Sequence, residues 1–157
     1  MAYDSTIEDL VDNVESFVSA NMAAYVTGIN TAKGDITLEA IRSVTVGDTD
    51  PYESNVYPIV QLYPEQLEVE QISTGYDSIH MTIIGLIAIK ETGTNQQKKL
   101  LRYTEALRQV LRDYVDLGES DFDVNKADMV ITYYPTDPSV GVAVSTVQFG
   151  VMKEVST

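Results

Sequence analysis

Few side chains in this sequence could carry out catalysis. The chain has one histidine, His80, and no cysteine, which excludes thiolate nucleophiles, disulfides and cysteine-ligated metals. No serine lies in a nucleophile-elbow context, and the nine glycines are too scattered to form a phosphate-binding loop. Because His80 falls within an apolar run typical of a strand, we interpret it as a structural or surface residue. We therefore expect no enzyme activity, no catalytic residues and no cofactor.

Two acidic clusters have a spacing that could suit a hard cation. The stretch 121–132 begins like a calcium-binding loop, but its sixth position is Lys126 and its twelfth is Thr132, where an EF-hand needs Gly and Glu. Asp48 and Asp50 flank a turn, and acidic turn residues commonly hydrogen-bond their own backbone. We therefore predict no metal site at either place.

The net charge of −14 at pH 7 makes the chain strongly acidic. Such a chain repels phosphate, so we expect neither nucleic-acid nor anionic-membrane binding. Half of its ten Lys and Arg residues nevertheless fall within a short stretch: Lys98, Lys99, Arg102, Arg108 and Arg112. Two interpretations stay open. In the first, the five basic residues form a docking face for an acidic partner. In the second, they form a solvated helix face that is balanced by the nearby acidic residues Glu105, Asp113 and Asp116.

Apolar periodicity predicts the elements that would position these residues. Apolar residues recur at three- and four-residue steps over 5–27 and 94–117, which predicts two amphipathic helices, the first ending at Gly28. Six further segments are typical of strands: Ile41–Val46, Val56–Leu62, Leu67–Ile72, Ile79–Lys90, Ala127–Tyr134 and Val140–Met152. We predict a single α+β domain over 1–157 in the order α-β-β-β-β-α-β-β. Its sheet would be mostly antiparallel, with about four to six strands and both helices on one face.

The segment Ile79–Lys90 is apolar on both of its strand faces. Two helices can cover only one face of the sheet, so the other face needs a folded-back segment or a neighbouring subunit. We take three residues of that second face, Ile84, Leu86 and Ala88, as a candidate subunit interface together with the basic residues of the second helix. In the last strand the apolar phase shifts by one residue, which predicts a β-bulge or a strong twist there.

The order of these elements resembles the tail terminator proteins of long-tailed bacteriophages. An amphipathic helix is followed by the segments ITLEAIRSVTVGD and YPIVQLYPE, then by the long strand HMTIIGLIAIK. A helix (NQQKKLLRYTEALRQVLRDY) and a final hairpin (MVITYYP and VAVSTVQFGV) complete the order. The likeness covers most of the chain. It lies in the order of the elements and in their apolar and polar patterning, because no fingerprint motif is involved. Related neck and tail-completion proteins look similar at this level.

This resemblance implies a structural virion protein of the tail or neck, assembled in the host cytoplasm. It implies a homo-oligomeric ring, commonly a hexamer, that sits on the last layer of tail-tube protein, stops tube polymerisation and offers a surface to the head–tail connector. We expect no membrane partner, because no apolar run approaches the roughly 20 residues of a spanning helix. The alternatives are another head–tail joining protein, a non-viral α+β binding or regulatory module, and a metal-dependent hydrolase.

Overall fold

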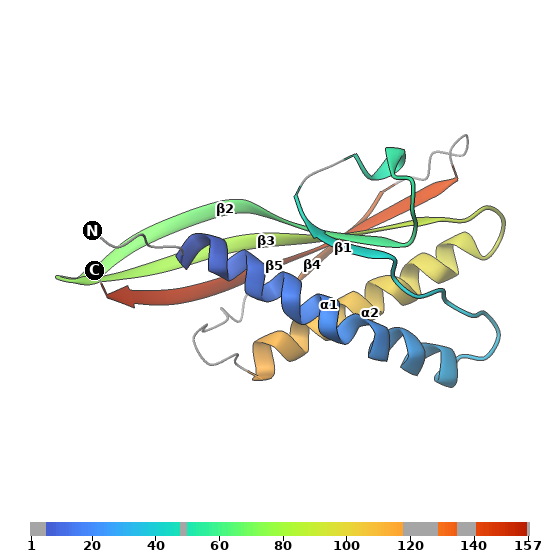
Figure 1. The fold of residues 1–157 in the computed structure, drawn as a ribbon, viewed down its shortest axis with the longest axis horizontal. Helices are drawn as coiled ribbons and strands as arrows, with labels where there is room; N and C mark the ends of the chain where they lie inside the picture. Colours follow the sequence, from blue (N-terminus) through green and yellow to red (C-terminus); the bar gives the residue numbers. More distant parts are fainter. Residues whose placement is uncertain (1–5, 48–49, 118–128, 135–140, 157) are drawn as a thin grey trace.

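The computed structural model of the chain describes residues 6–47, 50–117, 129–134 and 141–156. These residues form one α+β unit in which two helices pack against a five-stranded, mostly antiparallel sheet (Figure 1). The α+β class and the placement of both helices on one face confirm the expectations from the sequence. Neither helix within the described ranges is long and apolar enough to cross a membrane.

The two helices are α1 (Thr6–Ala32) and α2 (Gln96–Leu117). Each buries an apolar stripe, which in α1 consists of Leu10, Val14, Val18, Met22 and Val26. The helices also contact each other, and the rings of Phe17 and Tyr114 meet edge to face at 5.2 Å between centroids. Such stripes hold the helices in place because helices of this length depend on tertiary packing in water.

The predicted end of the first helix at Gly28 is wrong, since α1 continues to Ala32. The loop after α1 is tied back to the helix by Asn30. Its side-chain oxygen accepts from the Leu38 amide at 2.7 Å, and its side-chain nitrogen donates to the Leu38 carbonyl at 3.0 Å. This pair of bonds, together with the burial of Leu38, fixes the start of the path to the sheet.

The strands lie in the order β1-β2-β3-β5-β4. Only β1 and β2 are parallel, and the other neighbours are antiparallel. The bounds are β1 Ser43–Val46, β2 Ile59–Ser73, β3 Tyr76–Lys90, β4 Val130–Tyr133 and β5 Val142–Ser156.

Two of the predicted strands, Val56–Leu62 and Leu67–Ile72, are one continuous strand. The proline that separates them in the sequence, Pro64, lies inside β2 next to a register shift against β3. Proline lacks an amide hydrogen, so it is tolerated at a strand edge that has no further partner. The neighbouring strand β1 pairs with β2 only as far as Leu62, which leaves this edge open beyond it.

The predicted β-bulge in the last strand is also wrong, because β5 keeps an unbroken register with β3 along its length. The shift in apolar phase has another cause. Val142 and Val144 are buried on the face away from the helices, whereas Val147, Phe149 and Val151 are buried against the helices. The strand therefore stays regular while the face that is covered changes along it.

The helices approach the middle of the sheet closely at Gly85 of β3. A Cβ atom at this position would lie 3.3 Å from Cδ2 of Leu107 and 3.4 Å from Cδ2 of Leu62. A second link between helix and sheet is the hydrogen bond between the buried hydroxyls of Thr104 and Ser145, at 2.6 Å. Both features fix how α2 lies across β3 and β5.

Candidate functional site

The face of the sheet away from the helices, which we call the outer face, is covered at one end by the chain itself. A small apolar cluster there comprises Ile59, Leu86, Ala88, Val142 and Val144, with Tyr52, Tyr57 and Tyr63 packed against it. Tyr52 and Tyr57 belong to the connection between β1 and β2, which folds back over the sheet. Of the two ways to cover this face, the folded-back segment is therefore the one found here.

This covering changes how the three candidate interface residues in β3 are interpreted. Leu86 and Ala88 are 7% and 0% exposed, so the expectation that they form an open apolar surface is wrong. Ile84 precedes these two residues in β3, lies opposite Gln148 of β5 and is half-buried. The physical reason is that the long β1–β2 connection brings aromatic rings onto the outer face.

The folded-back segment is held by local hydrogen bonds. Asp50 caps the short 3-10 helix Pro51–Glu53, its carboxylate accepting from the Tyr52 amide at 2.9 Å. The Tyr57 hydroxyl donates to the Pro51 carbonyl at 2.6 Å, and burial raises the pKa of this hydroxyl. The interpretation of Asp50 as a turn residue is thereby confirmed.

The strand β2 is no longer covered by the helices beyond Tyr63. All ten residues from 64 to 73, which we call the arm, are exposed. Their partners on β3 include Ile79 and Met81, which remain buried, so burial ends between β3 and the arm. Figure 1 shows that β2, β3 and β5 extend together past the helices toward the β2–β3 turn.

The arm combines exposed apolar side chains with negative charge. Leu67, Val69 and Ile72 are 40%, 56% and 48% exposed. The arm also carries three glutamates, Glu65, Glu68 and Glu70, and it has no Lys or Arg. Leu67 and Val69 alternate with glutamates along the strand, and no described part of the chain covers these two apolar side chains. An exposed edge with apolar side chains is a surface that favours pairing with another chain.

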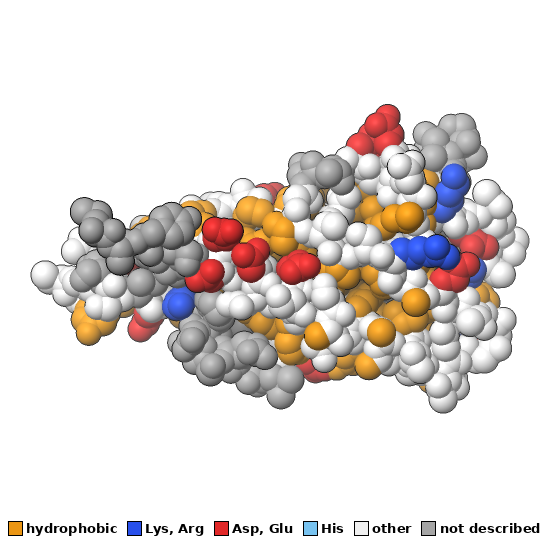
Figure 2. Space-filling model, viewed as in Figure 1, with side chains coloured by type: hydrophobic (Ala, Val, Ile, Leu, Met, Phe, Trp, Pro, Cys, Tyr) orange, Lys and Arg blue, Asp and Glu red, His pale blue; other side chains and the backbone are white. Residues whose placement is uncertain are grey.

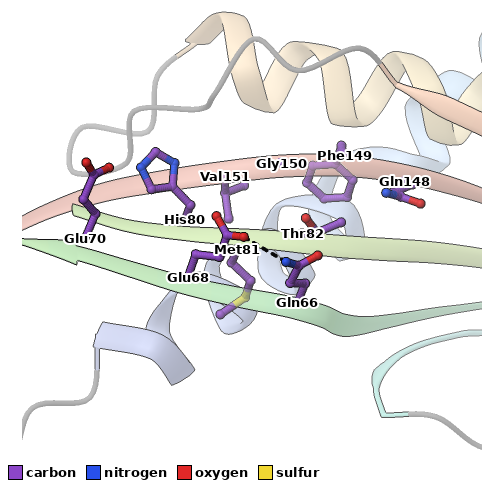
Figure 3. A pocket seen from close by; sticks show the side chains of 10 residues that line it. All are labelled: Gln66, Glu68, Glu70, His80, Met81, Thr82, Gln148, Phe149, Gly150 and Val151. Carbon is purple, nitrogen blue, oxygen red and sulfur yellow. Dashed lines mark hydrogen bonds between the residues drawn. The ribbon is translucent and has the colours of Figure 1, made fainter.

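A polar hollow of about 370 Å³ lies on the outer face beside the arm and contains the single histidine (Figure 3). His80 Nε2 and Ser78 Oγ share a hydrogen bond at 3.0 Å, and Gln66 donates to Glu68 at 2.9 Å. Ser78 is buried, at 4% exposure. We interpret the Ser78–His80 pair as a structural contact.

Metal-ligating residues do not gather anywhere in the described ranges, where no group of three His, Asp or Glu side chains converges. Of the acidic clusters singled out in the sequence, Asp50 serves as the helix cap described above. Asp48, Asp121 and Asp123 lie outside the described residues.

The basic residues of α2 are mostly engaged in ion pairs within the chain. Lys98 and Arg102 both contact Asp35, at 3.2 and 2.8 Å, and Lys99 contacts Glu91 at 2.9 Å. Arg108 pairs with Glu105 at 2.6 Å, one of the acidic residues expected to balance this helix. The other partners come from loops, because the start of α2 faces the connection after α1. Arg112 is exposed farther along the helix.

Asp35 is the centre of this ionic network. Hydrogen bonds from Arg102 and then from Lys98 hold the pKa of its carboxyl at about 2, well below its ordinary value. In the same way, the Arg108 guanidinium lowers the pKa of Glu105. The loop carrying Asp35 is therefore joined to α2 by charge, although the carboxylate itself stays in water.

An open groove of about 780 Å³ lies between the C-terminal part of α1 and the N-terminal half of α2. We call it the helix groove, and its lining includes Ala24, Tyr25, Ile29, Lys98, Leu101 and Arg102. Leu101 is 43% exposed although it lies on an otherwise well-packed helix. Figure 2 shows apolar side chains gathered over the region of α1 and α2, with acidic side chains over the N-terminal part of α1.

Comparison with protein-family models and with curated protein sequences finds no match for this chain.

Proposed function

We propose that this chain is a ring-forming tail terminator of a long-tailed bacteriophage, which caps the tail tube, stops its polymerisation and provides the docking surface for the neck. The proposal begins from the resemblance in element order. It is supported by one structural observation above all, the arm at residues 64–73, which is exposed along its whole length.

The arm supports an assembly role for a physical reason. An isolated chain gains nothing by keeping Leu67, Val69 and Ile72 in water on an unpaired strand edge, and such an edge risks uncontrolled association. A closed ring removes this risk because each arm is covered by a neighbour and no free copy of the interface remains. The exposed arm is therefore better explained by a subunit than by a monomeric binding module.

The decisive experiment deletes the gene from the phage that carries it and examines the particles by electron microscopy. We expect tails of uncontrolled, mostly excessive length that fail to join heads, and we expect normal tails when the gene is supplied in trans. Tails of normal length that remain separate from heads would instead identify a head–tail joining protein. Normal virions in the deletion would exclude both and favour the non-viral binding or regulatory module.

A biochemical experiment complements the genetic one. The native mass of the purified chain is measured alone and after addition of the phage's tail-tube protein. We expect a ring, with six subunits as the commonest number in the family, and we expect tube growth to stop when the chain is added. Continued tube growth in the presence of the assembled chain would contradict the capping function.

A further inference from the structure

The arm and the helix groove have complementary chemistry. The arm carries Leu67, Val69 and Ile72 among three glutamates. The helix groove has an apolar floor that includes Ile29 and Leu101. Its rim is basic: three cations, Lys33, Lys98 and Arg102, line the groove with one carboxylate, Glu105. Asp35 pairs with Lys98 and Arg102. A basic rim is notable in a chain whose net charge is −14.

The dimensions of the two surfaces also agree. The stretch of α1 that lines the helix groove runs from Ala24 to Lys33. At a rise of about 1.5 Å per residue it is roughly 14 Å long. The apolar part of the arm, from Leu67 to Ile72, covers roughly 17 Å at about 3.4 Å per strand residue. The two lengths are similar, with the arm the longer of the two.

The arm and the groove of one chain cannot meet. Figure 1 shows the β2–β3 turn at one extreme of the molecule, while the end of α1 and the start of α2 lie toward the other extreme. A contact between two different surfaces at opposite ends joins identical chains head to tail. Such a contact forms a ring when the rotation closes.

We propose that the arm of each subunit docks into the helix groove of the next copy, so that this contact closes the ring. The proposal rests on the proposed function in needing a ring, and it names the two surfaces that form it. Leu67 and Val69 lie against the floor near Leu101, and the negative charge of the arm lies beside the basic rim.

The test uses two single substitutions at exposed positions, chosen so that the fold is kept. Val69→Lys places a cation in the arm, and Leu101→Glu places an anion in the groove. Each substitution opposes like charges across the contact. Because both residues would lie at the centre of the contact, we expect each to weaken subunit association at least about thirty-fold, the effect of an interface hot spot. Sedimentation velocity and circular dichroism should show folded monomers.

Mixing the two variants distinguishes a head-to-tail contact from other arrangements. The Val69→Lys chain keeps an intact groove, and the Leu101→Glu chain keeps an intact arm. Equal amounts should therefore associate into a dimer, or into an alternating ring if the two introduced charges pair. A mixture that stays monomeric would overturn the proposal, as would a wild-type chain that stays monomeric at millimolar concentration.

Two matched controls carry the same changes elsewhere. Val46→Lys alters a valine of β1 that is 45% exposed, and Gln97→Glu adds an anion to α2 outside the groove lining. Both should assemble like wild type. If Val69→Lys and Leu101→Glu assemble equally well, the ring is built from other surfaces and the capping function is unaffected. If the variants behave as expected but the gene deletion gives normal tails, the proposed contact is supported and the proposed capping function is wrong.

Discussion

A substitution of Leu107 measures how much the packing of α2 against the sheet contributes to the free energy of unfolding. The Leu107 side chain is fully buried, and its Cδ2 atom would be 3.3 Å from a Cβ atom placed on Gly85. Leu62 and Leu111 border the same point at 3.4 and 3.7 Å, so this part of the core has little room to collapse. We therefore expect Leu107→Ala to lower the free energy of unfolding by about 3–4 kcal/mol, in the range of buried Leu→Ala changes.

The neighbouring glycine provides an internal control for that magnitude. In the wild type, Gly85→Ala forces Leu107 to shift by a few tenths of an ångström. This overpacking costs about 1 kcal/mol, and the stiffer unfolded chain offsets about 0.4–1 kcal/mol of it. When Leu107 is already alanine, the new methyl group enters emptied space and contributes about 0.8 kcal/mol, the value for one buried methylene. The effect on the unfolded chain is the same in both backgrounds and cancels, so the double variant should be more stable than additivity predicts by about 1.8 kcal/mol.

Urea unfolding of the four proteins, followed by circular dichroism under conditions that keep them monomeric, completes this double-mutant cycle. The m-values should stay constant, so that the shifts in midpoint report stability. Effects that add within about 0.3 kcal/mol would refute the close approach of α2 to β3 at Gly85. A loss below about 1 kcal/mol for Leu107→Ala would show that this stripe of α2 is not part of the core.

Three further predictions concern the loop after α1. Tyr103→Phe removes the 2.6 Å bond from the hydroxyl to a loop carbonyl and should lower the free energy of unfolding by about 1 kcal/mol in urea titrations. Arg102→Gln should raise the pKa of Asp35 from about 2 toward its ordinary value in an NMR titration. Because the pKa of Asp35 is lowered in the folded state, the ion pair stabilises the fold at pH values above the ordinary aspartate pKa, and this stabilisation is lost as the pH falls through about 2. An Asp35 titration that is the same in the variant as in the wild type would count against the pairing. The Leu38 amide, bonded to Asn30, should exchange slowly in the free subunit, whereas fast exchange there would show that the loop is not tied to α1.

The sequence by itself determined the two helices and most of the strands. Their apolar residues repeat at the spacing of the element, and this spacing depends only on backbone geometry. It also predicted the helix stripe around Leu107 and the turn role of Asp50. Local patterns were least reliable at boundaries, where Gly28 was taken as the end of a helix and the interval containing Pro64 as a gap between two strands. Gly28 and Pro64 lie inside α1 and β2, because an exposed helix face tolerates glycine and an open strand edge tolerates proline.

Only the tertiary structure decided which apolar faces stay open. Leu86 and Leu67 are both apolar strand residues, yet the first is buried by the folded-back β1–β2 connection and the second is exposed in the arm. Likewise, the acidic partner of Lys98 and Arg102 is Asp35, more than sixty positions away along the chain. Exposure and ion pairing depend on which segments, far apart in the sequence, contact each other in the fold. A periodic pattern describes one segment and carries no information about its contacts with others.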